Sequence, residues 1–326
     1  MQKLFKYVAP LLVILLAACS PKIKLFSDMS DPLMELTISG TGKEKVLVIP
    51  ISGIISDRVK RGLIEKPSLV QEVVSHLRLA ENDPQVKAVV FKINSPGGSA
   101  TASDIIYHET MAFKKRSGVK VVAALMNLAT SGGYYISLPA EYIMAHPTTV
   151  TGSVGVVMLM PKLDGLMAKI GVDVDVQKSG EYKDMASPFR PATRAEKKIF
   201  EELTDALGSR FVRLVNDHRR LNPDQMANVS SARIFIARDA LAAGLIDGIG
   251  YLNDALAKAR ELSGLSPDAR VVVYRRTRYA NDNLYNTATM QTGHLDLSLV
   301  NYNLPDNLSF LDAGFFYLWL PVAGSF

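Results

Sequence analysis

Short apolar runs alternate with segments of helical spacing through the first half of the chain. The continuous apolar run at 46–49 is typical of a strand that is buried on both faces of a parallel or mixed sheet. Residues 86–93, which are rich in β-branched residues, and the apolar segment 119–125 are also predicted as strands. Segments 68–80 and 103–115 instead repeat their apolar residues every three or four positions, as an amphipathic helix does. This alternation predicts an α/β fold in which right-handed crossovers place helices over the sheet.

Shorter elements continue the pattern in the second half. We expect strands at 142–145, 154–160 and 172–177, helices at 163–170 and 193–220, and one or two further helices over 240–262, which glycines interrupt. Residues 263–326 show the weakest pattern, with a Tyr/Asn-rich stretch and an apolar end at 315–321. The sequence therefore predicts a folded domain at 45–262 and a C-terminal extension at 263–326.

The first 19 residues have the pattern of a bacterial lipoprotein signal. Two lysines precede an apolar run at 8–18, which is too short to span a bilayer but suits an export signal. The run ends in LAAC, which resembles a lipobox, so Cys19 is the expected site of lipidation. Cys19 is the only cysteine, which excludes an intramolecular disulfide. The alternative is an incidental cysteine within an uncleaved signal anchor.

Composition and this leader indicate where the protein acts. Residues 20–44 are polar and contain Pro and Gly, and we interpret them as a tether between the lipid and the folded domain. We expect the bacterial cell envelope, with the lipid-anchored domain facing the periplasm. The net charge of +5 is spread along the chain without any nucleic-acid-binding motif, so a nucleic-acid partner is not expected.

Ser131 is the strongest candidate nucleophile. It stands in the segment Thr130-Ser131-Gly132-Gly133, between a predicted strand and a predicted helix start, where backbone N–H groups favour developing negative charge. The simpler interpretation is a helix N-cap followed by a glycine turn. The tripeptide alone does not separate the two.

A serine hydroxyl needs a base to remove its proton, and two kinds of residue could supply one. Of the five histidines, His146 alone lies near a strand end on the predicted active face. Lysine is the other choice, but its ordinary pKa of about 10.4 must be lowered by burial before it can accept a proton. With 37 basic residues, residue type alone does not single out a lysine.

Three separated motifs resolve this choice by resemblance. They are NSPGGSA at 94–100, TSGGYYISLPAEYIMAHPTTVTGSVGVV at 130–157 and SGEYKDMASPFR at 179–190. Together they resemble the signal peptide peptidase A (protease IV) family, in the short bacterial lipoprotein form, and the similarity extends more loosely over about 45–260. The resemblance implies a serine endopeptidase with a Ser-Lys dyad.

The motifs assign roles to five residues. By resemblance, Ser131 is the nucleophile, Lys183 is the general base and Ser153 is the serine that orients the lysine. Gly98 and the backbone N–H of Gly132 match the oxyanion hole. His146 replaces the small or polar residue expected at its position, which leaves a Ser131-His146 pairing open.

The family resemblance also implies an architecture and a partner. It implies a crotonase/Clp-protease-like fold with repeated ββα units, no metal or other cofactor, and subunits assembled into a ring or dome. Ser131 and Lys183 of one site could then come from neighbouring subunits. Membrane-associated peptides, such as cleaved signal peptides, are the expected substrates. An acyl-CoA hydratase or isomerase on the same fold is the alternative, although export argues against a CoA-dependent enzyme.

Overall fold

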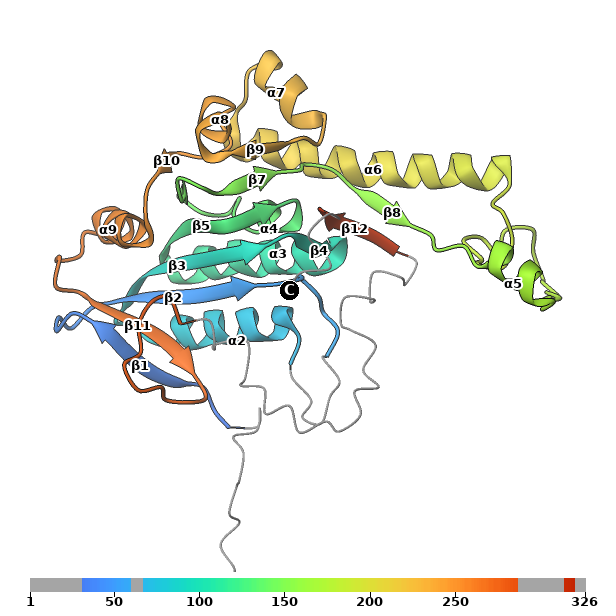
Figure 1. Cartoon of the computed structure of the whole chain (residues 1–326). Coiled ribbons are helices and arrows are strands. Elements are labelled where there is room, and N and C mark those ends of the chain that lie inside the picture. The colour runs from blue at the N-terminus through green and yellow to red at the C-terminus, as the bar shows by residue number, and fades with distance from the viewer. Residues whose placement is uncertain (1–30, 60–66, 287–313, 320–326) are drawn as a thin grey trace, which may run out of the picture.

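The computed structural model describes residues 31–59, 67–286 and 314–319, and Figure 1 shows how the elements are arranged. Cys19, the expected signal peptide and the first part of the expected tether lie outside the described residues.

A parallel sheet forms the centre of the molecule. Its middle strands lie in the order β2 (Lys45–Ser52), β3 (Val86–Ser95), β5 (Lys120–Thr130) and β6 (Tyr142–Ala145), and each pairs in parallel with the next. Because these strands are β-branched, apolar and buried on both faces, they require helices on each side. The sequence therefore correctly predicts an α/β fold.

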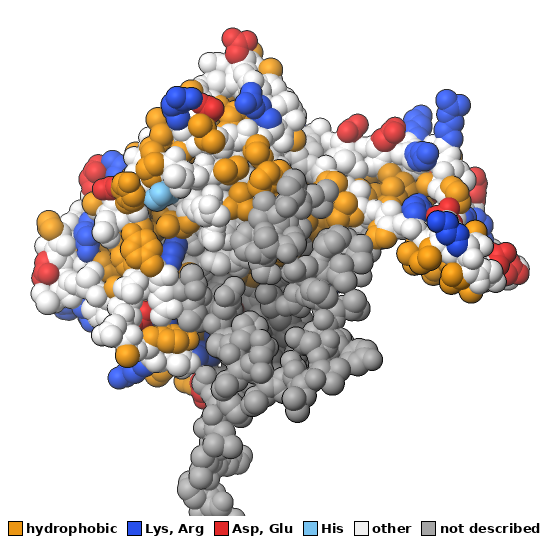
Figure 2. Space-filling view, in the orientation of Figure 1, with side chains coloured by type: hydrophobic (Ala, Val, Ile, Leu, Met, Phe, Trp, Pro, Cys, Tyr) orange, Lys and Arg blue, Asp and Glu red, His pale blue; other side chains and the backbone are white. Residues whose placement is uncertain are grey.

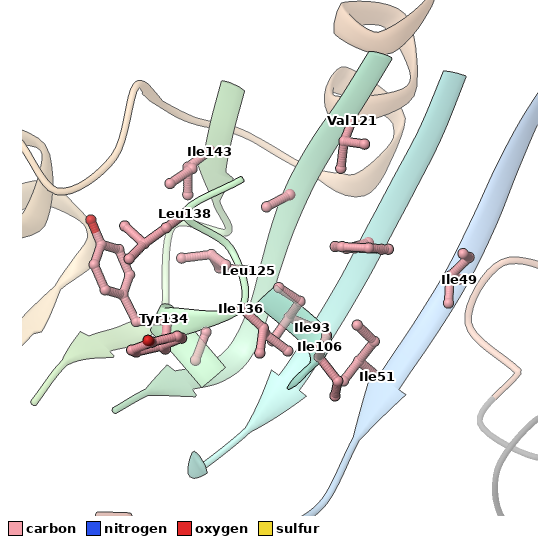
Figure 3. Close-up of a cluster of buried hydrophobic side chains, with 14 of the residues drawn as sticks. Ile49, Ile51, Ile93, Ile106, Val121, Leu125, Tyr134, Ile136, Leu138 and Ile143 are labelled. Carbon is pink, nitrogen blue, oxygen red and sulfur yellow. The ribbon is translucent and has the colours of Figure 1, made fainter. Parts of the chain in front are cut away.

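Helices from different parts of the chain cover the two faces of this sheet. The helices α2 (Leu69–Glu81) and α3 (Ala100–Ser117) pack against one face, in a core that includes the residues labelled in Figure 3. The helix α9 (Leu252–Ser263) packs against the other face, over alternate residues of the same strands. The result is a three-layer domain (Figure 1).

The remaining elements extend the sheet at its edges. In the described residues, β11 (Arg270–Arg275) pairs in parallel with β2 and antiparallel with β1 (Met34–Ser39), while β10 (Gly248–Ile249) pairs with β6. The short strand β7 (Val150–Gly152) links β5 to β9 (Ile234–Ile236). The helices α7 and α8 span Pro223–Ser230 and Ala237–Ala242.

A second, small sheet lies beside the first. It contains β4 (Gly97–Ser99), β8 (Val157–Leu159) and β12 (Gly314–Leu318), with β12 in the middle and antiparallel to both neighbours. The helix α4 (Gly132–Tyr135) follows β5 directly. Three segments far apart in the sequence therefore meet next to the start of α4.

An arm projects away from the sheets (Figure 1). We define the arm as residues 162–196, which include α5 (Asp164–Ile170), a segment without helix or strand, and the start of the long helix α6 (Arg194–Arg219). The predicted strand at 172–177 is wrong, since these residues are exposed and pair with no other strand among the described residues. A strand needs the backbone hydrogen bonds of a neighbouring strand, and no described sheet edge lies beside these residues.

Two other expectations differ from the structure. Residues 34–39, expected within the tether, form β1 because Leu36 and Ile38 alternate with more polar residues and pack against the α9 side of the core. The expected C-terminal extension supplies β11 and β12, so its described part belongs to the two sheets.

Candidate active site

Ser131 occupies a strained turn between β5 and α4. Its backbone has φ 53° and ψ −117°, a combination that a non-glycine residue adopts only when its surroundings impose it. The residue is 1% exposed, and its hydroxyl makes no hydrogen bond with any described residue. A side chain at Gly133 would collide with the Ser95 carbonyl oxygen at 2.6 Å, which explains the glycine there. The turn presents an unpaired hydroxyl at the C-terminal end of β5.

The turn is held from one side by β7. The Ser131 N–H donates to the Gly152 carbonyl at 2.7 Å, which continues the pairing of Thr130 with Gly152. Ser153 follows at once, also with a positive φ of 54°, and its N–H donates to the Arg233 carbonyl at 2.8 Å. The structure thus brings Ser153 next to the strand end that carries Ser131.

Gly98 lies on β4, close to the start of α4. Its neighbours bond to Ile55 on one side, since the Ile55 N–H donates to Gly97 and the Ser99 N–H donates to Ile55. The N–H and carbonyl of Gly98 itself therefore point the other way, toward β12. A Cβ at Gly98 would lie 2.0 Å from the Ile55 carbonyl oxygen, so only glycine fits.

Gly132, directly after Ser131, supplies the second predicted backbone N–H donor. A Cβ on Gly97 would lie 2.7 Å from the Gly132 nitrogen, and one on Gly132 would lie 3.1 Å from the Gly97 Cα, so β4 and the start of α4 are in close contact. The structure therefore brings together four of the predicted residues, Ser131, Gly132, Gly98 and Ser153. Two backbone N–H groups beside a serine hydroxyl are what an acyl-transfer site requires.

Lys183 is not part of this cluster within one chain. It lies on the arm, in a turn closed by its own N–H to the Gly180 carbonyl at 3.1 Å, and its side chain is exposed. No hydrogen bond or ion pair joins the Lys183 ammonium to any described residue. The turn is attached to the base of α5 through Leu163, whose N–H donates to Pro188 at 2.7 Å.

Arg190 fixes the segment that follows Lys183. Its guanidinium donates to Asp184 at 2.8 and 2.9 Å and also pairs with both carboxylate oxygens of Glu196, at the N-terminus of α6. The hydrogen bonds from Arg190 lower the pKa of Glu196 to about 2 and hold the pKa of Asp184 well below its usual range. These charge-assisted hydrogen bonds hold the segment directly after Lys183 against the start of α6.

His146 takes part in other contacts. Its Nδ1 lies 2.9 Å from the Thr148 hydroxyl, and its ring meets the Tyr251 ring edge-on with 5.0 Å between centroids. No described hydrogen bond links His146 to Ser131. The geometry gives the Ser131-His146 alternative no support.

Three aromatic residues at the site escaped sequence analysis. The ring centroids of Tyr135, Phe211 and Tyr317 lie within 5.0 Å of one another, and Tyr135 lies on the helix that follows Ser131. The described part of the apolar end at 315–321 forms β12, which pairs with β4 and β8. The alternation of Phe315 and Tyr317 on one strand face was the available signal.

Comparisons with known proteins identify the family of the chain. The model of peptidase family S49 matches residues 113–266, and the model of Clp protease matches 61–152. A protein of Methanocaldococcus jannaschii described as a protease is 32% identical over 269 residues, covering 82% of this chain and 85% of that protein. A protein of Enterococcus faecium described as signal peptide peptidase SppA is 32% identical over 253 residues, covering 77% and 73%.

Among solved structures, a point mutant of ClpP1 from Listeria monocytogenes aligns with a TM-score of 0.42 at 18% identity, covering 64% of this chain and 94% of that one. The fold is α/β of the Clp protease type, and the protein is a serine-type peptidase. The chain belongs to peptidase family S49, the family of signal peptide peptidase A.

Two further findings concern the described residues alone. They contain no group of three His, Cys, Asp or Glu side chains arranged as a metal site. They also contain no helix with the length and hydrophobicity needed to cross a membrane.

Proposed function

We propose that the protein is an endopeptidase in which Ser131 attacks the peptide carbonyl and Lys183 of a neighbouring subunit accepts its proton. The observation that carries this proposal is the convergence of the strained Ser131 with the N–H groups of Gly98 and Gly132. The attack forms an acyl-enzyme, and the lysine passes the proton to the departing amine. Water then hydrolyses the ester and restores the serine. Ser153 orients the lysine.

The surface of the arm supports a contribution from a second subunit. Many large apolar side chains are exposed on the arm, and Figure 2 shows hydrophobic side chains gathered there. They are Leu163, Leu166, Ile170, Val172, Val174, Val176, Tyr182 and Phe189. An apolar patch of this extent on a projecting segment is typical of an interface. Docking this arm on an adjoining copy would carry Lys183 toward that copy's Ser131, consistent with a ring or dome.

Docking would also supply the chemistry that the lysine needs. A lysine acts as a base only in its neutral form, and burial away from water favours that form. In a single chain Lys183 is exposed. A neighbouring subunit that covers the arm would remove this water, so assembly and activity are coupled in the proposal.

The proposed substrates are membrane-associated peptides such as cleaved signal peptides. Support comes from the LAAC segment before Ser20, which would anchor the protein by a lipid on Cys19. Support also comes from the similarity to a protein described as signal peptide peptidase SppA. We propose an envelope location with the peptidase domain in the periplasm.

Complementation between inactive variants tests the proposal. Full-length Ser131→Ala and Lys183→Ala proteins should each lose at least about a thousandfold in peptide hydrolysis. Mixing and reassembling them should restore part of the activity, because some interfaces then pair an intact serine with an intact lysine. Lys169→Ala, which changes another exposed lysine of the arm, is the matched control. Full activity in Lys183→Ala would refute the dyad, and failure of complementation would refute the shared site.

A further inference from the structure

The helix α4, which begins directly after Ser131, is only four residues long and depends on its neighbours for its position. A single helical turn is not stable by itself, because ordering its backbone costs more than its few hydrogen bonds recover. Ser131 adds the strain of its positive φ to this turn. The orientation of the Gly132 N–H therefore depends on the contacts that hold α4.

Two adjacent tyrosines of α4 make hydrogen bonds to different parts of the fold. The Tyr134 hydroxyl donates to the Leu245 carbonyl at 2.6 Å, on the segment between α8 and β10. The Tyr135 hydroxyl donates to Oδ1 of Asp104 at 2.6 Å, on helix α3. Both tyrosines are fully buried. The second of these hydrogen bonds attaches α4 to α3.

Helix α3 is continuous with the strand that carries Gly98. The strand β4 ends at Ser99 and α3 begins at the next residue, where the Ser99 hydroxyl accepts from the Ala102 N–H at 3.3 Å. The Ser103 hydroxyl donates back to the Ser99 carbonyl at 3.0 Å. These hydrogen bonds join Gly98 and the first turn of α3 in one unit.

Two neighbouring residues of α3 contact opposite ends of α4. A Cβ on Gly132 would lie 2.5 Å from the Ser103 hydroxyl oxygen, so α3 closely approaches the first residue of α4. Asp104 bonds Tyr135, which is the last residue of α4. The positions of the Gly98 and Gly132 N–H groups relative to each other are therefore set where α3 meets α4.

The Asp104 carboxylate is itself oriented by a third helix. Arg210 of α6 donates to the same Oδ1 at 2.7 Å. Partial burial alone would raise the pKa of Asp104, but the hydrogen bonds from Tyr135 and Arg210 hold it below its usual value. The carboxylate is therefore charged at neutral pH, and hydrogen bonds to a charged acceptor are about twice as strong as neutral ones.

We propose that Asp104 is a positioning residue that aligns the Gly98 and Gly132 N–H groups into one oxyanion site for the reaction of Ser131. This inference rests on the proposed function. The carboxylate does not touch the substrate and acts through the Tyr135 hydroxyl. Its loss lets α4 shift against α3, which weakens stabilisation of the transition state more than binding of the substrate.

Steady-state hydrolysis of a peptide by full-length variants tests this role. Asp104→Ala and Tyr135→Phe should each lower kcat about tenfold or more and leave KM within about twofold, since a misaligned donor acts on the transition state. Asp104→Asn keeps an acceptor oxygen at the same place and should stay within about threefold of the wild-type kcat. A change in KM with unchanged kcat would refute the alignment.

Tyr134→Phe is the matched control for Tyr135→Phe. It removes one buried hydroxyl and one 2.6 Å hydrogen bond from the same helical turn, on the side of Leu245. Thermal unfolding should show similar losses of stability in the two variants, while kcat of the control stays within about twofold of the wild-type value. Equal losses of kcat in both variants would show a general loosening of α4 and overturn the role of Asp104.

A double variant tests whether Asp104 and Tyr135 act as one unit. Asp104→Ala/Tyr135→Phe should have the kcat of Asp104→Ala alone to within about twofold, because the hydroxyl has no effect once its acceptor is gone. Losses that multiply would show two independent effects and contradict the proposal.

Hydrogen exchange separates this inference from the proposed function. Amides at 132–136 should exchange at least about threefold faster in Asp104→Ala than in Asp104→Asn, whether or not the protein hydrolyses peptides. Unchanged exchange in Asp104→Ala would refute the positioning role. Faster exchange in this variant together with an inactive wild-type protein would refute the peptidase mechanism alone.

Discussion

The ring of Tyr317 stacks on the ring of Tyr135, with 5.0 Å between centroids and 20° between planes. Tyr135 lies on the first turn after Ser131, whereas Tyr317 comes from the far end of the chain. This contact joins the C-terminal strand to the helix that follows Ser131. Loss of the Tyr317 ring should therefore be visible in thermal unfolding.

Tyr317→Ala should lower the free energy of unfolding by about 3 to 5 kcal/mol, because it removes a 2% exposed ring that contacts Tyr135 and Phe211. Thermal unfolding of the two proteins measures the change. An unchanged melting temperature would contradict this packing.

Gly98→Ala should reduce kcat by about a hundredfold or more. The added methyl group would lie 2.0 Å from the Ile55 carbonyl oxygen, so β4 must shift and one oxyanion donor moves with it. Gly208→Ala is the matched control, because its Cβ would meet nothing within 4 Å on helix α6. The control should retain activity and melt at the same or a higher temperature, since alanine favours helix.

Arg190→Ala should reduce activity about tenfold or more without unfolding the central sheet. The arginine joins Asp184 to Glu196, and its loss would free the turn that carries Lys183. Arg194→Ala, an exposed arginine at the start of α6, serves as control. Circular dichroism should show both proteins folded, and peptide hydrolysis should distinguish them. Equal activity would show that the Lys183 turn does not depend on Arg190.

The same ion pairs should make the arm sensitive to acid. Arg190 lowers the pKa of Glu196 to about 2 from its ordinary value of 4.5, so the charged carboxylate is favoured in the folded arm. This stabilisation is fully present above about pH 4.5 and is lost as the pH falls through about 2. Hydrogen exchange of amides at 183–193 should therefore accelerate over this interval. In Glu196→Gln, exchange should already be faster at neutral pH and change less with acid.

The local pattern of apolar and polar residues was sufficient to predict the strands and helices of the central domain. The run at 46–49 is apolar on both faces, which favours a covered parallel sheet, and the spacing at 68–80 predicts α2. Ser131 and Gly98 could be located because their motifs are short and contiguous in sequence.

Long-range pairing was what the sequence did not reveal. The strands β1 and β12 each gain their partners from segments more than 150 residues away, and no local property of their residues names those partners. The aromatic contacts of Tyr317 likewise combine α4, α6 and β12. The run at 172–177 shows the converse, since its apolar residues lie exposed on the arm. An apolar run identifies a buried surface without identifying the chain that buries it.

At position 131, the residue that would give the most stable protein differs from the residue that the proposed reaction needs. A positive φ in a serine costs about 1 to 3 kcal/mol, which glycine would not incur. Ser131→Gly should therefore yield a protein that resists heat better and hydrolyses nothing. The serine at this position therefore lowers thermal stability, and in return it supplies the hydroxyl that the proposed reaction needs.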